Sequence, residues 1–149
     1  MQNTRLSRLF WISGVLLVML LHASLPSEAL TVSGTIQTAE RWTLADSPIQ
    51  ITGAVIIPQT VTVTIEPGVQ VHLAPEAVIT VKGQFDARGT TESPVAFSPL
   101  TTSRWCAISY DDTGTGILEH CLLHRGSYGE GSRIGVVSVY RNSAPVLID

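Results

Sequence analysis

The chain has 149 residues, with nine lysines and arginines against twelve aspartates and glutamates, a formal net charge of −3 at neutral pH. The basic residues are scattered singly, so no stripe of positive charge follows a phosphate backbone, and we expect no nucleic-acid partner. The sequence also lacks a phosphate-cradling glycine loop, a Cys-x-x-Cys pair and a dinucleotide fingerprint. We therefore expect no cofactor.

Residues 1–29 have the features of a signal peptide. Arg5 and Arg8 provide a positive start, an uninterrupted, largely apolar run extends from Leu9 to Leu21, and Ser27-Glu-Ala29 offers small residues to a signal peptidase. We predict cleavage after Ala29 and export, either as a secreted or as a cell-surface protein. An uncleaved membrane anchor is the alternative, but spanning a bilayer takes about 20 apolar residues. No stable membrane span is expected after cleavage.

The mature chain from Leu30 to Asp149 is long enough for one domain with a single core. It remains acidic, because the predicted signal peptide removes two arginines and only one glutamate. We assign residues 30–48 to an N-terminal cap or lead-in and residues 49–149 to repeated coils.

Short β-strands with a period of two follow one another along the mature chain. Apolar and polar residues alternate in two neighbouring segments, at 61–65 and 69–73. The alternation predicts half-buried strands, with His72 among the outward side chains. Between them, Glu66-Pro-Gly-Val69 has proline where φ is already fixed and glycine where φ must be positive, which predicts a type II turn.

Three glycines recur at a fixed interval among these strands. The interval from Gly53 to Gly68 equals that from Gly68 to Gly83, and each glycine lies between two short β-rich segments. We interpret them as equivalent corners of a solenoid in which one such interval makes one coil. Similar places on successive coils then form an inward apolar ladder, predicted to consist of Val55, Val71 and Phe85.

The second half of the mature chain continues this pattern. Strands are predicted at 105–110, 116–123 and 134–140, and a second set of residues has the same interval as the glycines, namely Cys106, Cys121 and Val136. Polar, glycine-rich stretches at 111–116 and 126–132 separate the strands. We expect these two loops to project outward, where solenoid loops commonly bind ligands.

Several motifs run through the mature chain in a definite order. They are Trp42-Thr-Leu-Ala-Asp-Ser-Pro48, Ile51-Thr-Gly53, Val63-Thr-Ile-Glu-Pro-Gly-Val69, Val78-Ile-Thr-Val-Lys-Gly83, Ala87-Arg-Gly-Thr90, Pro94-Val-Ala-Phe97 and Trp105, followed by Leu118-Glu-His-Cys121 and Ser143-Ala-Pro-Val146. This order resembles the opening coils of exported right-handed parallel β-helix proteins with the pectin-lyase-like fold. The resemblance implies an all-β fold, a right-handed parallel β-helix, over almost all of the mature chain.

The last residues, Val146-Leu-Ile-Asp149, read as the first strand of another coil, with no polar cap after them. Members of the fold usually have many more coils. We interpret the sequence as a fragment that is truncated at its C-terminus. The alternative is that the open coil associates end to end with a partner, because uncapped strand edges favour pairing.

The two cysteines allow two interpretations. If Cys106 and Cys121 stacked one coil apart, their α-carbons would be about 5 Å apart, a distance that a disulfide accepts. Free thiols packed in the core are the interpretation that we favour.

His120, Cys121 and His124 are the residue types that bind zinc or copper. On a continuous strand, however, the two histidines would share one face while Cys121 points to the other. We therefore assign no metal site and interpret the histidines as solvent-facing.

Asp111 and Asp112 begin a predicted loop, and we place Glu119 and Arg125 on adjacent coils beside it. The resemblance implies where catalysis would lie, since polysaccharide lyases of this fold combine calcium-binding carboxylates with a basic side chain. Arg125 fits no such pattern, so we assign no catalytic residue. Trp105 and Tyr110 are the types of residue that stack on sugar rings, or else they fill the core.

Two functions are consistent with these features. The first is an exported, non-catalytic β-helix module for surface interaction, adhesion or binding of a polysaccharide or cell-surface glycan. The second is the N-terminal fragment of a polysaccharide lyase or glycoside hydrolase whose active coils lie beyond residue 149. The first is the prediction that we carry forward.

Overall fold

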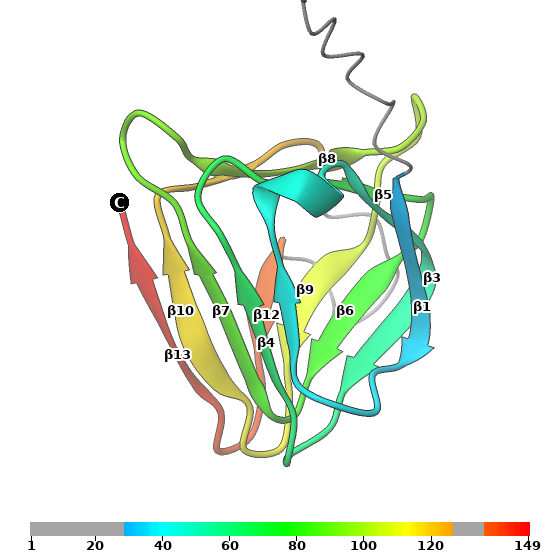
Figure 1. Cartoon of the computed structure of the whole chain (residues 1–149). Coiled ribbons are helices and arrows are strands. Elements are labelled where there is room, and N and C mark those ends of the chain that lie inside the picture. Colours follow the sequence, from blue (N-terminus) through cyan, green and yellow to red (C-terminus); the bar gives the residue numbers. More distant parts are fainter. Residues whose placement is uncertain (1–28, 127–135) are drawn as a thin grey trace, which may run out of the picture.

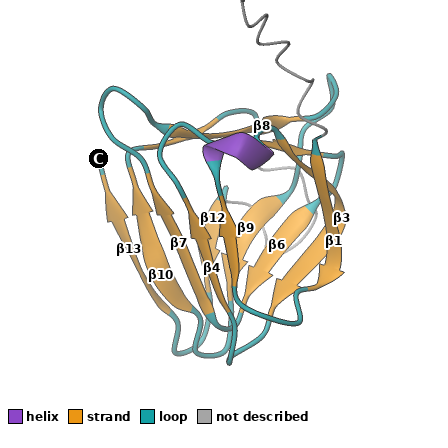
Figure 2. Cartoon of the chain, viewed as in Figure 1, coloured by secondary structure: helices purple, strands orange, loops and turns teal. Residues whose placement is uncertain are grey.

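A computed structural model describes residues 29–126 and 136–149 (Figure 1). The predicted signal peptide lies outside this part of the chain except for Ala29, and so does the predicted loop at 126–132 except for Gly126. Nearly all described elements are strands, with one short 3-10 helix (Figure 2). They are β1 (Leu30–Thr35), β2 (Glu40–Trp42), η1 (Leu44–Asp46), β3 (Ile49–Ile57), β4 (Thr62–Ile65), β5 (Gln70–Leu73), β6 (Val78–Val81), β7 (Gln84–Arg88), β8 (Val95–Pro99), β9 (Ala107–Tyr110), β10 (Thr115–Glu119), β11 (Cys121–Leu123), β12 (Val137–Val139) and β13 (Ala144–Ile148).

The strands form three walls, which the chain visits in the same order in each coil (Figure 1). Wall A contains the first half of β3, then β5, β8 and β11. Wall B contains the second half of β3, then β6, β9 and β12. Wall C contains β2, β4, β7, β10 and β13. Every pairing is parallel, and β1 pairs with both halves of β3.

This architecture confirms the predicted all-β fold, a right-handed parallel β-helix, here with about four turns. The predicted lead-in at 30–48 contains β1, β2 and η1, of which the two strands pair with β3 and β4. The predicted type II turn is also confirmed. Gly68 has a φ of 80°, and the Val69 N–H donates to the Glu66 carbonyl at 3.4 Å.

The predicted coil length is wrong. Ile49 pairs with Val71 in wall A, and Gln84 pairs with Thr115 in wall C. In both pairs, the number of residues from one coil to the next is larger than the interval between the glycines. That interval therefore spans only part of a three-walled coil. Successive glycines of the set therefore lie at different corners: Gly53 between walls A and B, Gly68 between C and A, and Gly83 between B and C.

The predicted ladder of Val55, Val71 and Phe85 is wrong for the same reason. All three side chains are fully buried, but they belong to walls B, A and C respectively. Val71 stacks between Ile49 and Phe97 in wall A. The real ladders follow the longer steps between coils.

Alternate residues of each wall point inward and form one continuous core. Its aromatic centre is Phe85, whose ring lies 6.3 Å from both Trp42 and Phe97, edge-on to Trp42 and tilted toward Phe97. In the last described coil, several apolar side chains are exposed, among them Leu122, Val139, Val146, Leu147 and Ile148. End-to-end association through this coil stays a prediction.

Candidate functional site

The outward surface of wall C carries polar side chains from successive coils. Strand alternation buries Val63, Phe85 and Leu118 and turns their neighbours toward solvent. The parallel register then aligns these neighbours in rows, for example Thr62 beside Gln84 and Gln84 beside Thr115. We call this surface the polar face; it consists of Arg41, Thr62, Thr64, Glu66, Gln84, Asp86, Arg88, Thr115 and Glu119.

Asp86 is the most enclosed member of the polar face, with only 8% of its surface exposed. Its carboxylate accepts hydrogen bonds from Gln84 Nε2 at 2.9 Å and from the backbone N–H of Ile117 at 3.1 Å. Arg88 Nη2 lies 3.9 Å away on the same strand. Asp86 thus links β7 to β10 and orients the Gln84 side chain.

Opposite charges face each other across neighbouring coils of this surface. Arg41 forms an ion pair with Glu66 at 2.8 Å, and Arg88 Nη1 lies 3.7 Å from Glu119 Oε2. Each pair is solvent-exposed enough to contribute little to stability. The pairs instead bring charged hydrogen-bonding groups side by side, at a strand spacing of about 4.8 Å.

A second group of charges lies at the corner between walls B and C. Asp112 pairs with Lys82 of the preceding coil at 3.0 Å and with Arg141 of the following coil, which also approaches Asp111 at 3.4 Å. The prediction that Glu119 and Arg125 lie beside Asp111 and Asp112 is wrong. Glu119 pairs with Arg88 on wall C, and Arg125 lies at the corner between walls A and B. The ion pairs of Asp112 thus join three successive coils at the corner between walls B and C.

We expect the Asp112 ion pairs to make stability depend on pH. Lys82, and next Arg141, hold the pKa of Asp112 below its ordinary value of 3.8. Because the folded pKa is the lower one, this stabilisation is present above the unfolded value and is lost as the pH falls through the folded value. Asp112→Asn should therefore lower the Tm at pH 6, and its difference from the wild type should shrink in acid.

Thermal melts between pH 2 and pH 6 measure this difference. Glu92→Gln is the matched control, because Glu92 is exposed and forms no ion pair with the described residues. A Tm difference for Asp112→Asn that stays constant over the whole pH range would contradict the assignment.

A cavity of about 460 Å³ opens at the corner between walls A and B. Its lining comes from three successive coils: Pro75 and Glu76, then Thr102, Ser103 and Arg104, then Arg125. We call it the arginine corner. Arg125 Nη2 donates to the Thr102 carbonyl at 2.6 Å, which fixes its guanidinium against the loop of the preceding coil.

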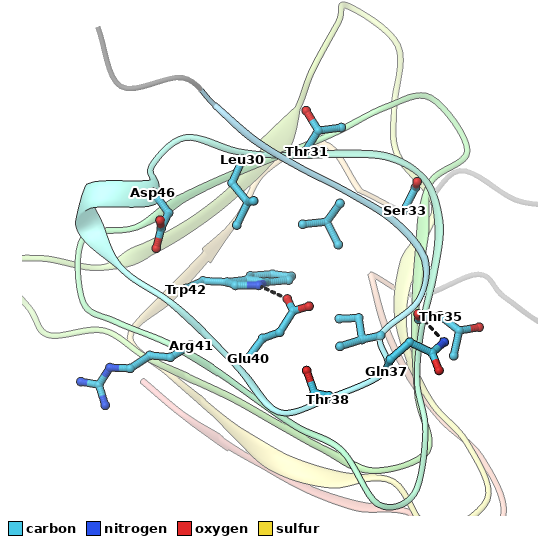
Figure 3. A pocket seen from close by; sticks show the side chains of 12 residues that line it. Leu30, Thr31, Ser33, Thr35, Gln37, Thr38, Glu40, Arg41, Trp42 and Asp46 are labelled. Carbon is cyan, nitrogen blue, oxygen red and sulfur yellow. Dashed lines mark hydrogen bonds between the residues drawn. The ribbon is translucent and has the colours of Figure 1, made fainter. Parts of the chain in front are cut away.

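Another cavity of about 460 Å³ lies over the first coil (Figure 3). Trp42 and Glu40 point into the coil, and the Trp42 indole N–H donates to Glu40 Oε2 at 2.8 Å. Trp42 is 1% exposed, so its ring covers the core and offers no face to a sugar. Asp46 is held by the Thr43 hydroxyl and backbone N–H, which lower its pKa. The lining residues thus close the N-terminal end of the core.

Trp105 and Tyr110 are core residues. Both are fully buried; the Trp105 indole N–H donates to the His124 carbonyl at 2.9 Å, and the Tyr110 hydroxyl donates to the Phe85 carbonyl at 3.4 Å. Burial, with Asp86 nearby, raises the pKa of Tyr110. Stacking of either ring on a sugar is therefore excluded by this arrangement.

Cys106 and Cys121 are free thiols on different walls. Cys106 precedes β9 of wall B, whereas Cys121 lies in β11 of wall A and pairs with Val95. A disulfide would require Cys106 and Cys121 to stack one coil apart. The prediction of that stacking is wrong, because it assumed a coil shorter than the real one. Desolvation raises the pKa of Cys121 to about 11, which keeps its thiol protonated at neutral pH.

His120, Cys121 and His124 do not lie on one strand. The predicted strand at 116–123 is divided into β10 and β11, and His120 between them has a φ of 43°. His120 is half-buried and His124 is exposed. Among the described residues, no three histidine, cysteine, aspartate or glutamate side chains are grouped so that they would hold a metal ion.

Comparison of the chain with protein-family models, curated proteins and solved structures gave no match. In the described ranges, no helix has the length and apolar character needed to cross a membrane. The fold and the surfaces above are therefore the basis for proposing a function.

Sequence reasoning missed the residues that make these surfaces, above all Asp86, Arg88, Arg104 and Arg141. A signal for two of them was present, since buried Phe85 and Ala87 place Asp86 and Arg88 on the opposite side of the strand. Arg104 and Arg141 lie between strands, where periodicity gives no direction.

Proposed function

We propose that this chain is an exported, non-catalytic β-helix module of the pectin-lyase-like type that binds a polysaccharide or cell-surface glycan. The observation that carries the proposal is the polar face, where threonine, glutamine and charged side chains of successive coils are aligned by parallel register. A linear polymer with regularly spaced hydroxyl groups is the class of ligand that matches such rows.

The chemistry of the polar face supports this class of ligand. Gln84 and Thr115 donate and accept hydrogen bonds, and Arg88 and Glu119 supply the stronger charge-assisted ones. Gln84 is already oriented by its hydrogen bond to Asp86. Binding through Gln84 therefore costs little side-chain entropy, which favours affinity on a flat surface.

Export is supported by the position of the first strand. β1 begins at Leu30, directly after the predicted cleavage point at Ala29. Removal of the signal peptide would leave every strand of the described solenoid in place.

We expect the purified chain to be retained by at least one of cellulose, chitin and gel-immobilised acidic polysaccharide. Arg88→Gln should weaken retention about tenfold, the effect of losing one charge-assisted hydrogen bond. Affinity electrophoresis and sedimentation with the insoluble polymers measure the change. Gln70→Ala, on the exposed surface of wall A, is the control that should retain wild-type binding.

Two results would contradict the proposal. Absence of retention on all polymers would remove its support, and so would equal weakening by Arg88→Gln and Gln70→Ala. Release of reducing or unsaturated sugars by the purified chain would instead contradict the non-catalytic part of the proposal, and it would place active coils within this chain rather than beyond residue 149.

A further inference from the structure

The basic side chains of the described part of the chain divide into two groups. Four pair with carboxylates: Arg41, Lys82, Arg88 and Arg141. The other two, Arg104 and Arg125, form no ion pair within the described ranges, and both line the arginine corner. Among the described residues, the positive charge that has no carboxylate partner is thus concentrated at one cavity.

The arginine corner is built by a lengthened loop. Between walls A and B, the second coil passes from β5 to β6 through residues 74–77 alone, whereas the next coil uses residues 100–106 between β8 and β9. Thr102, Ser103 and Arg104 lie in this longer loop and are exposed. The core does not require them, and exposed loops on a rigid scaffold are common binding sites.

The geometry of the donors suits an anion. The bond from Arg125 to the Thr102 carbonyl fixes one guanidinium, whose other N–H donors form no hydrogen bond within the described part of the chain. Arg104 provides a second guanidinium, and the hydroxyls of Thr102 and Ser103 are further donors. Guanidinium groups bind carboxylate and sulfate oxygens in a bidentate manner, which makes them well suited to such groups.

We propose that the arginine corner binds an oxyanion, the carboxylate or sulfate group of an acidic ligand. Glu76 lines the same cavity and bears the opposite charge, but no ion pair joins it to either arginine. Glu76 therefore lowers the positive charge of the cavity, and it repels an anion that approaches from the side where Glu76 lies. The site does not involve the polar face, so the two proposals fail or succeed separately.

The test compares three polymers with one backbone: dextran, carboxymethyl-dextran and dextran sulfate. The full chain should bind at least one charged polymer more tightly than unmodified dextran, and the preferred polymer identifies the oxyanion as carboxylate or sulfate. Arg104→Gln should weaken binding of that polymer about tenfold. Glu76→Gln should strengthen it, because a repulsive charge is removed.

Arg141→Gln is the control for charge alone. It removes the same charge at the corner between walls B and C, apart from both the arginine corner and the polar face. It should change the preference for a charged over an unmodified dextran by less than about twofold. Equal weakening by Arg104→Gln and Arg141→Gln, weakening by Glu76→Gln, or no preference for either charged polymer would overturn the proposal.

Discussion

Gly83→Ala is expected to destabilise the fold by about 3 kcal/mol or more. A β-carbon at this position would lie 2.1 Å from the Pro58 carbonyl oxygen and 2.3 Å from that of Val61. Both oxygens belong to the backbone of the preceding coil, so relief of the clash requires that two coils move apart. Chemical denaturation followed by far-ultraviolet circular dichroism measures the loss.

Gly53→Ala is the matched control. A β-carbon at Gly53 meets no heavy atom within 4 Å, so we expect a change of less than about 1 kcal/mol in the free energy of unfolding. Similar losses for the two variants would contradict the three-walled arrangement, which places these glycines at different corners.

Phe85→Ala is expected to lower the free energy of unfolding by about 3–5 kcal/mol. Phe85 is fully buried and is the ring that contacts both Trp42 and Phe97. Its removal opens a cavity where walls A and C meet in the core, and these short coils have little freedom to collapse into it. The Tm should fall by about 10 °C or more.

Phe85→Leu keeps most of the buried volume and should cost less than half as much as Phe85→Ala. Thermal melts of both variants, monitored by near-ultraviolet circular dichroism, separate loss of packing from loss of strands. A Phe85→Ala chain with wild-type stability would show that this residue does not lie at the centre of the core.

Local sequence patterns predicted the strands and corners of this fold. The alternation around Val63 and Val71 gave strands that the structure contains, and Glu66-Pro-Gly-Val69 gave the correct turn. The coil length was predicted wrongly, because Gly53, Gly68 and Gly83 perform different tasks. Gly68 is needed for its positive φ and Gly83 for close approach of another coil, while Gly53 has neither constraint.

The surfaces were harder to predict for a physical reason. Arg88 and Glu119 are distant in the sequence. They are neighbours in the structure because the coil that joins β7 to β10 has longer loops than the coil that joins β4 to β7. A sequence with one assumed period cannot place such pairs. Arg104 and Arg125 likewise line one cavity through loops whose lengths follow no repeat.

The polar face is the central claim, and nuclear magnetic resonance tests it most directly. A soluble oligosaccharide cut from the polysaccharide that retains the chain would be titrated while the side-chain amide of Gln84 and the Nε–H of Arg88 are observed. We expect both signals to shift with one saturating curve, while the side-chain amides of Gln50 and Gln70 on wall A stay in place. Shifts confined to wall A, with Gln84 and Arg88 unchanged, would contradict the claim.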